Sequence, residues 1–195
     1  MTLATATTVP TSPFVAARLS AQLAAAWAAA PERWQHLVRH VPGERWYLPL
    51  DELIAEGTAA VGARGAASAW LITWAPGTGL DLHDHGGSAG SLAVVSGVLS
   101  ERYGRLAPGE PDEPGAGRLQ GRLRRRRLRR GSVTTFGPDH VHAVRNDGVE
   151  PAVSIHVYVP GLTEMAFYDA PPAARPGVRT HTVPAATPQE QGETR

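Results

Sequence analysis

Residues 77–85 read GTGLDLHDH and place two histidines, His83 and His85, two positions apart. In a β-strand, residues two apart point to the same face of the sheet, so both imidazoles can reach one metal ion. Asp84 then points to the opposite face, which argues against it as a metal ligand. Imidazole suits iron, nickel, copper and zinc. The stretch therefore predicts a β-segment that carries two ligands of a metal site.

A second histidine pair, His140 and His142, lies in PDHVHAVRN, residues 138–146. These two side chains would also share a face of a strand, so spacing alone leaves open which of them binds a metal. A single His-x-His pair is a weak signal, because solvated or hydrogen-bonded pairs are more common. Two pairs in successive β-segments of a chain without cysteine are more informative.

Composition narrows the classes of protein. The 195 residues suit one domain, and a formal charge of +1 gives no global field to recruit nucleic acid or membrane. The absence of cysteine excludes disulfides, zinc-thiolate sites and a cysteine nucleophile. We find no signal-peptide pattern at the N-terminus and no apolar run near the roughly 18 residues of a membrane span. A cytoplasmic protein without a membrane or nucleic-acid partner is expected.

The chain changes character near residue 67. Residues 1–13 are predicted as a flexible N-terminus and residues 14–45 as N-terminal helices, with a break at Ala30-Pro31. Short runs rich in Val, Leu, Ile, Thr and Trp then predict an all-β sandwich or barrel over residues 67–165. These runs are residues 68–74, 91–97, 98–106, 132–136 and 152–160. Residues 108–117 read as a loop, and residues 171–195 as a Pro-rich tail that wraps the surface or is disordered.

The run from Arg122 to Arg130 contains seven arginines. It lacks interleaved aromatic residues and the global charge is near zero, so a nucleic-acid site is disfavoured. An edge strand kept soluble by charge is the preferred interpretation.

The two histidine stretches resemble the two motifs of the cupin family. Gly77, His83, His85 and Gly97 match the spacing of the first motif, and Gly131, His142 and Asn146 match the second. The resemblance implies a cupin (jelly-roll) β-barrel, one domain over residues 14–170, and selects His142 as the third ligand with His140 as a neighbour. Many cupins have a glutamate ligand where this chain has Gly90. The resemblance therefore implies a site of three histidines.

Within the cupins, residues 74–168 are similar to bacterial members of the cysteine dioxygenase type I family. The similarity implies an Fe(2+) enzyme that oxidises a small thiol with O2 to its sulfinic acid. It assigns catalytic roles to Ser154, His156 and Tyr158, which alternate with Val153, Ile155 and Val157. From the alternation alone, a strand with its polar face in water is equally compatible. Gly90 occupies the position of a cysteine that crosslinks to the tyrosine in some animal members, so Tyr158 is expected to be unmodified.

The substrate contacts are the least defined part. The family places a carboxylate-binding arginine two residues after a tyrosine, and if Tyr47 is that tyrosine, Pro49 stands in its place. Arg45 or Arg64 could substitute. Trp74 would line the pocket or simply pack in the core.

Several substrates and one non-enzymatic role stay open. L-cysteine is the leading substrate, with 3-mercaptopropionate, cysteamine or a bulkier thiol as alternatives. A non-catalytic cupin that binds a metal or small ligand is the other class. We expect a monomer or weak homo-oligomer.

Overall fold

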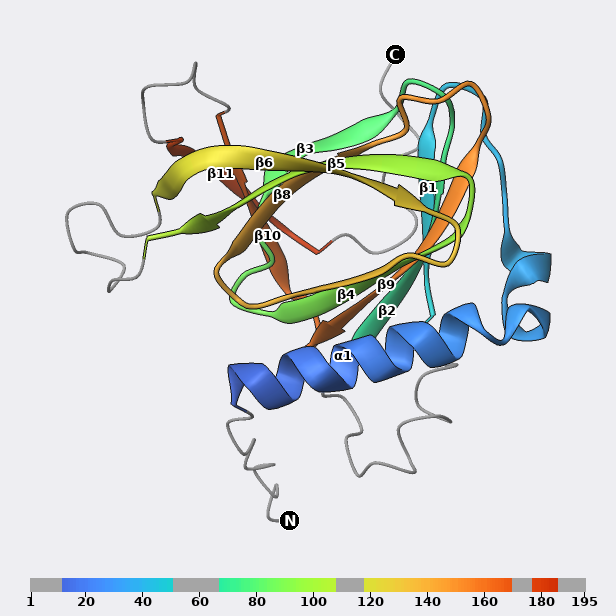
Figure 1. The fold of residues 1–195 in the computed structure, drawn as a ribbon, viewed down its shortest axis with the longest axis horizontal. Coiled ribbons are helices and arrows are strands. Elements are labelled where there is room, and N and C mark those ends of the chain that lie inside the picture. Colours follow the sequence, from blue (N-terminus) through green and yellow to red (C-terminus); the bar gives the residue numbers. More distant parts are fainter. Residues whose placement is uncertain (1–11, 51–66, 108–117, 170–176, 186–195) are drawn as a thin grey trace, which may run out of the picture.

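The computed structural model describes residues 12–50, 67–107, 118–169 and 177–185. Two antiparallel sheets lie face to face, and one α-helix covers the outer side of one of them (Figure 1). The elements, in chain order, are the helix α1 (Pro13–Ala28), two short 3-10 turns η1 (Pro31–Arg33) and η2 (Gln35–Leu37), and the strands β1 (Arg45–Pro49), β2 (Ser68–Trp74), β3 (Gly79–His83), β4 (Ala89–Ser96), β5 (Val98–Leu106), β6 (Leu119–Arg129), β7 (Val133–Phe136), β8 (His140–Arg145), β9 (Ala152–Val159), β10 (Glu164–Tyr168) and β11 (Arg179–Pro184).

The first sheet has the strand order β1-β2-β9-β4-β7, and the second has the order β11-β10-β3-β8-β5-β6. The architecture is mainly β and consistent with a jelly-roll. The sheets do not close into the expected β-barrel, because no strand pairing between described residues joins them.

The N-terminal region contains one α-helix where several helices were expected. Helix α1 ends at Ala28, close to the expected break, and Pro31 begins a 3-10 turn. Proline has no backbone N–H and its ring clashes with the preceding turn, so it does not continue a helix. The chain then becomes extended, and β1 begins at Arg45.

Two apolar layers hold the fold together. Trp27 of α1 packs with Leu71 and Ile155 on the outer face of the first sheet. A second cluster between the sheets joins residues of both: Ile72, Trp74, Leu92, Val94, Leu99, Leu128, Val144 and Ala152. Both faces of β9 are therefore covered, which is why all eight of its residues are buried.

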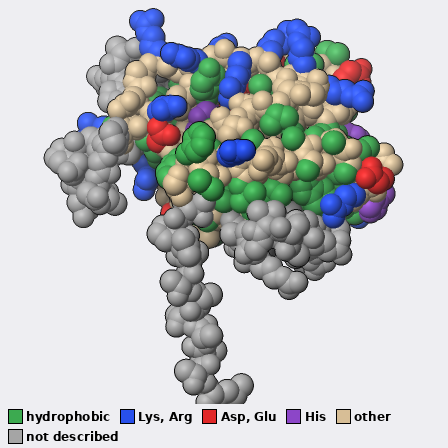
Figure 2. Space-filling model, turned by 60° about the horizontal axis from the view of Figure 1, so that its bottom comes forward, with side chains coloured by type: hydrophobic (Ala, Val, Ile, Leu, Met, Phe, Trp, Pro, Cys, Tyr) green, Lys and Arg blue, Asp and Glu red, His purple; other side chains and the backbone are tan. Residues whose placement is uncertain are grey.

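Several elements predicted from the sequence are present in the structure. Strands β2 and β5 have the predicted bounds, and β6, which carries most of the arginine run, is an edge strand as expected. Figure 2 shows basic side chains gathered along one edge of the molecular face that it presents. Residues 179–184, within the predicted tail, form β11 and pair with β10. Of the predicted flexible residues 1–13, residues 1–11 lie outside the described residues, as do the loop at 108–117 and Arg64, and Pro13 already begins α1. In the described part of the chain, no helix has the length and apolar character needed to cross a membrane.

Candidate metal centre

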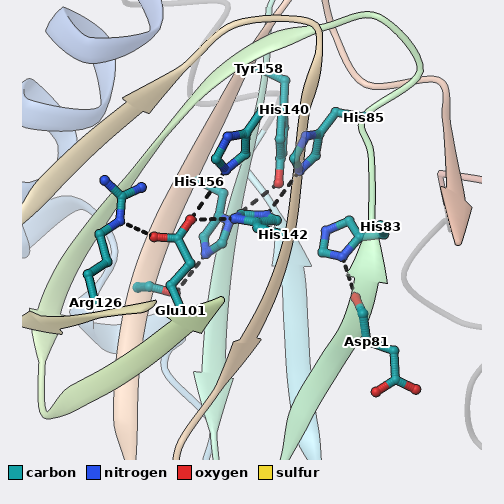
Figure 3. Close-up of polar contacts among 10 residues, drawn as sticks. Asp81, His83, His85, Glu101, Arg126, His140, His142, His156 and Tyr158 are labelled. Carbon is teal, nitrogen blue, oxygen red and sulfur yellow. Dashed lines mark hydrogen bonds and ion pairs between the residues drawn. The ribbon is translucent and has the colours of Figure 1, made fainter. Parts of the chain in front are cut away.

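His83, His85 and His142 converge between the two sheets (Figure 3). Their ring centroids form a nearly equilateral triangle: 4.8 Å from His83 to His142, 4.9 Å from His85 to His142 and 5.0 Å from His83 to His85. All three side chains are buried. The potential ligand atoms lie within 4.8 Å of one another. The structure thus brings together the three residues that the sequence predicts as ligands.

Strand pairing explains this convergence. His83 at the end of β3 is the direct antiparallel partner of His142 in β8, so their side chains share one face. Strand β3 ends at His83, so His85 lies in the following turn and not in a strand as expected. Asp84 points to the other side, as predicted, and accepts hydrogen bonds from the backbone N–H of Ala166 and the hydroxyl of Tyr168. It therefore anchors the turn that carries His85 to β10.

Hydrogen bonds at the far side of two rings orient their nitrogen atoms. His83 Nδ1 lies 2.7 Å from the carbonyl oxygen of Asp81, so Nδ1–H donates and Nε2 keeps its lone pair. His142 Nδ1 lies 2.7 Å from Glu101 Oε1, which in a neutral imidazole leaves Nε2 as the free base. Outer-shell bonds of this kind are typical of metal-ligating histidines.

The nitrogen atoms fit a cation. The Nε2 atoms of His85 and His142 lie 3.2 Å apart. Two nitrogens bound to one ion at about 2.1 Å lie roughly 3.0 to 3.4 Å apart for angles between right and tetrahedral. Burial, followed by the neighbouring His142, lowers the pKa of His83 and of His85 well below the ordinary value. Both imidazoles are therefore neutral, as ligation requires.

Glu101 is a functional candidate that the sequence reasoning missed. Its fully buried carboxylate accepts hydrogen bonds from His142 and Arg126 and lies 3.4 Å from His140 Nε2. Burial alone would raise the pKa of Glu101, but the bonds from His140, His142 and Arg126 hold it far below the ordinary value. The strand alternation could have revealed it, because Glu101 shares the inward face of β5 with Leu99 and Tyr103.

Glu101, His140 and His142 form a second group with possible ligand atoms. Here the carboxylate is already paired with the Arg126 guanidinium, so a cation bound at this group would lie close to another positive charge. The His140 ring stacks on Phe136, with centroids 4.6 Å apart and an interplanar angle of 14°. His140 is therefore better described as part of the wall behind His142 and Glu101.

Gly90 owes its identity to packing. A Cβ atom at this position would lie 2.6 Å from the ring of Phe136 and 2.9 Å from that of Tyr158. Phe136 also stacks on His85, with ring centroids 4.7 Å apart. Aromatic rings thus occupy the space that a side chain at position 90 would need, and no fourth ligand can come from there.

A chain of polar groups leads from the core to the cavity. Trp74 Nε1 donates to Ser154 Oγ at 2.9 Å, Ser154 Oγ lies 3.0 Å from His156 Nε2, and His156 Nδ1 lies 3.3 Å from the Tyr158 hydroxyl. Ser154, His156 and Tyr158 are 0%, 3% and 4% exposed. The alternative interpretation, in which the polar face of β9 lies in water, is therefore wrong.

The direction of this chain follows from its first member. Trp74 can only donate, so the hydroxyl of Ser154 accepts there and has its own proton to give to His156 Nε2. Burial lowers the pKa of His156 to about 3, so the ring is neutral and carries its proton on Nδ1. That proton faces the Tyr158 oxygen, which frees the Tyr158 O–H to donate elsewhere. Burial raises the pKa of Tyr158, which keeps this proton in place.

A cavity of about 430 Å³ adjoins the histidines. Its wall contains the predicted substrate contacts Arg45, Tyr47 and Trp74, together with Trp70, Ile72, Leu80, His83, His142, Val144, His156, Tyr158, Leu162, Met165, Phe167, His181, Val183, Pro184 and Ala185. Pro49 is not among these residues.

Arg45 is the one arginine among the described residues that line this cavity. Its guanidinium carbon lies 5.1 Å from the Tyr47 ring centroid and 5.7 Å from that of Trp74. Arg45 and Tyr47 share one face of β1, because they lie two residues apart. Burial lowers the pKa of Arg45, and no carboxylate of the described residues forms an ion pair with it. An anionic group of a ligand would complete its surroundings.

Several solved structures are similar to part of this chain. The TT1209 protein from Thermus thermophilus is 20% identical, with a TM-score of 0.45, and the match covers 65% of this chain and 93% of that one. A protein with a double-stranded beta-helix domain from Klebsiella pneumoniae is 20% identical, with a TM-score of 0.43 and coverage of 65% and 86%. An oxalate oxidase in complex with glycolate is 22% identical, with a TM-score of 0.45 and coverage of 65% and 56%. These likenesses say nothing about activity.

A search of curated protein sequences gives no significant match. A sequence model of cysteine dioxygenase type I, in contrast, matches residues 14–171, which include every histidine of the centre and the Ser154, His156 and Tyr158 chain. Because the match spans most of the 195 residues, this chain belongs to the cysteine dioxygenase type I family.

Proposed function

We propose that the protein is a non-haem iron(II) dioxygenase that oxidises a small thiol with O2 to its sulfinic acid. The triangle of three buried imidazoles without a carboxylate ligand, in a chain of this family, carries the proposal. Both oxygen atoms of O2 are added to sulfur, so R–SH and O2 become R–SO2H and no further reductant is needed. When bound by His83, His85 and His142, iron(II) would take the substrate as a thiolate and activate O2 beside it.

The protein's own groups would hold the substrate and manage one proton. Arg45 would bind a carboxylate of the substrate and thereby orient the sulfur toward the histidines. The Tyr158 hydroxyl, with His156 on its oxygen, would donate a hydrogen bond to the reacting groups. The aromatic walls Trp70, Trp74 and Phe167 would exclude water and so strengthen these interactions.

Arg45 narrows the choice of thiol. L-cysteine and 3-mercaptopropionate both carry a carboxylate that a guanidinium can bind. Cysteamine, in contrast, would place an ammonium group near the guanidinium of Arg45, which is unfavourable. No acidic side chain lines the described cavity, so the amine of cysteine has no anionic partner there, which supports 3-mercaptopropionate as the second candidate.

An oxygen electrode tests the proposal. Protein loaded with ferrous iron should consume O2 only when a thiol carboxylate is added, with one sulfinate formed for each O2. With ¹⁸O2, both labelled atoms should appear in the product. Bound iron without O2 consumption for any small thiol would instead support the non-catalytic metal-binding alternative.

A further inference from the structure

Strand β11 forms one wall of the cavity and lies beyond residues 14–171, the part that matches the family. His181, Val183 and Pro184 of β11 and the adjacent Ala185 line the cavity. Strand β11 is held by its antiparallel pairing with β10, including Phe167 opposite His181, whose rings stack at 4.8 Å. This wall of the cavity therefore comes from residues outside the part that matches the family.

The polar groups of the cavity gather beside the buried histidines, and its more exposed rim, the mouth, is apolar apart from His181. His83, His142 and Tyr158 are buried, whereas Phe167 and Val183 are half-buried and Pro184 is exposed. Leu162 and Met165 extend this apolar mouth. A ligand that fills the cavity therefore needs a polar head and an apolar body.

Cysteine is too small to use this space. The cavity measures about 430 Å³. At about 30 Å³ for each water molecule in the liquid, it equals the volume of roughly fourteen waters, about twice the number of non-hydrogen atoms in cysteine. Cysteine bound at Arg45 and the histidines would leave the apolar mouth in contact with water.

We propose that the preferred substrate is a thiol carboxylate with an apolar branch, and that the branch lies against the wall formed by Met165, Phe167 and Val183. This inference rests on the proposed thiol dioxygenase function and names its substrate class. The sulfur and carboxylate occupy the histidine and Arg45 end, and the branch extends toward β11.

Carboxylate binding to metal-free protein tests, without any turnover, whether the wall binds an apolar group. Propanoate and 3-phenylpropanoate share a carboxylate and differ in an apolar group, and their affinities are measured by the fluorescence of Trp70 and Trp74 or by calorimetry. The aryl compound should bind about 10- to 100-fold more tightly, because its ring is removed from water. Val183→Trp, which fills the mouth, should remove this preference. Val133→Trp, at an exposed valine of β7 in the other sheet, should leave it unchanged.

Turnover gives the second readout. In the wild type, kcat/KM for 2-benzyl-3-mercaptopropanoate should be more than ten times kcat/KM for 3-mercaptopropanoate. In Val183→Trp this ratio should fall below one. Equal affinities of the two thiol-free carboxylates for the wild-type protein would overturn the inference, whether or not Val183→Trp folds. If no thiol supports O2 consumption, the proposed function fails, and the carboxylate affinities still decide separately whether the wall binds an apolar branch.

Discussion

Glu101 Oε1 lies 2.7 Å from Nδ1 of His142, so a buried carboxylate of β5 holds the ring of a candidate metal ligand on β8. The same carboxylate is held in turn by Arg126 of the edge strand β6. The contact fixes which nitrogen of His142 faces the centre and adds negative charge behind it.

Glu101→Gln should weaken iron binding about 10- to 100-fold, because an amide can still accept the bond from His142 but carries no charge. Competition with a chelator of known affinity measures the change. Glu32→Gln, at an exposed glutamate of η1, is the matched control. An unchanged iron affinity in Glu101→Gln would show that the carboxylate has no influence on the centre.

Substitutions of the two histidines of β8 should have different effects on iron loading. His142→Ala should abolish iron loading, whereas His140→Ala should retain a near-stoichiometric content, measured by metal analysis of the purified protein. The reason is that the Nε2 of His142 faces His85, while the Nε2 of His140 lies 3.4 Å from Glu101 and is not grouped with His83 and His85. Loss of iron in His140→Ala alone would move the centre to the group of Glu101, His140 and His142.

Trp74→Phe should lower kcat by about three- to tenfold with unchanged iron content and KM. The substitution removes the Nε1–H that donates to Ser154 and keeps an aromatic ring, so the direction of the proton chain toward Tyr158 is no longer imposed. Steady-state kinetics with the thiol varied separates kcat from KM. Trp46→Phe, on the neighbouring strand β1, controls for loss of an indole. A change confined to KM would indicate that Trp74 only shapes the cavity.

Metal-free protein should lose stability as the pH falls from 7.5 to 5.5. Burial lowers the pKa of His156 to about 3 in the folded protein, whereas an unfolded histidine has a pKa near 6.5. Below pH 6.5 the unfolded chain therefore binds the proton first, and the free energy of unfolding falls by about 1.4 kcal/mol per pH unit from this residue. The lowered pKa values of His83 and His85 act in the same direction.

Urea unfolding at a series of pH values, with a chelator present, measures this slope. His156→Asn should make it shallower, and His36→Asn, at an exposed histidine, serves as the control. A stability that is flat between pH 7.5 and 5.5 contradicts the expectation.

Gly90→Ala should destabilise the protein by about 1 to 3 kcal/mol, because the added methyl group would overlap the rings of Phe136 and Tyr158. Chemical denaturation measures the loss. Gly148→Ala is the comparison, because the Cβ atom added there would have its nearest contact with the amide oxygen of Asn146, at 3.1 Å. Equal effects of the two substitutions would argue against tight ring packing at position 90.

The amino-acid sequence by itself determined much of the local structure and the pairing of His83 with His85, whereas the choice of His142 over His140 came from the resemblance to the cupin motif. Alternation of apolar and polar residues places Ser154, His156 and Tyr158 on one face of a strand, and the structure has them on that face. The bounds of β2 and β5 follow from the same alternation and from flanking turn residues. The alternation is a local property of the sequence. It assigns faces correctly whatever the strand pairs with, because the two-residue period of a strand does not depend on its partners.

Only the tertiary structure decided what lies opposite each face. The pairing of β5 with β6 and β8 brings Glu101 to Arg126 and His142. These residues lie far apart in the sequence, so the contact cannot be recognised from the sequence alone. The same holds for Arg45 beside Trp74 and for β11 at the mouth of the cavity, which the sequence analysis placed in a tail. The physical reason is that alternation assigns a side chain to a face, whereas its neighbours across the sheet depend on the register of strands that are distant in the chain.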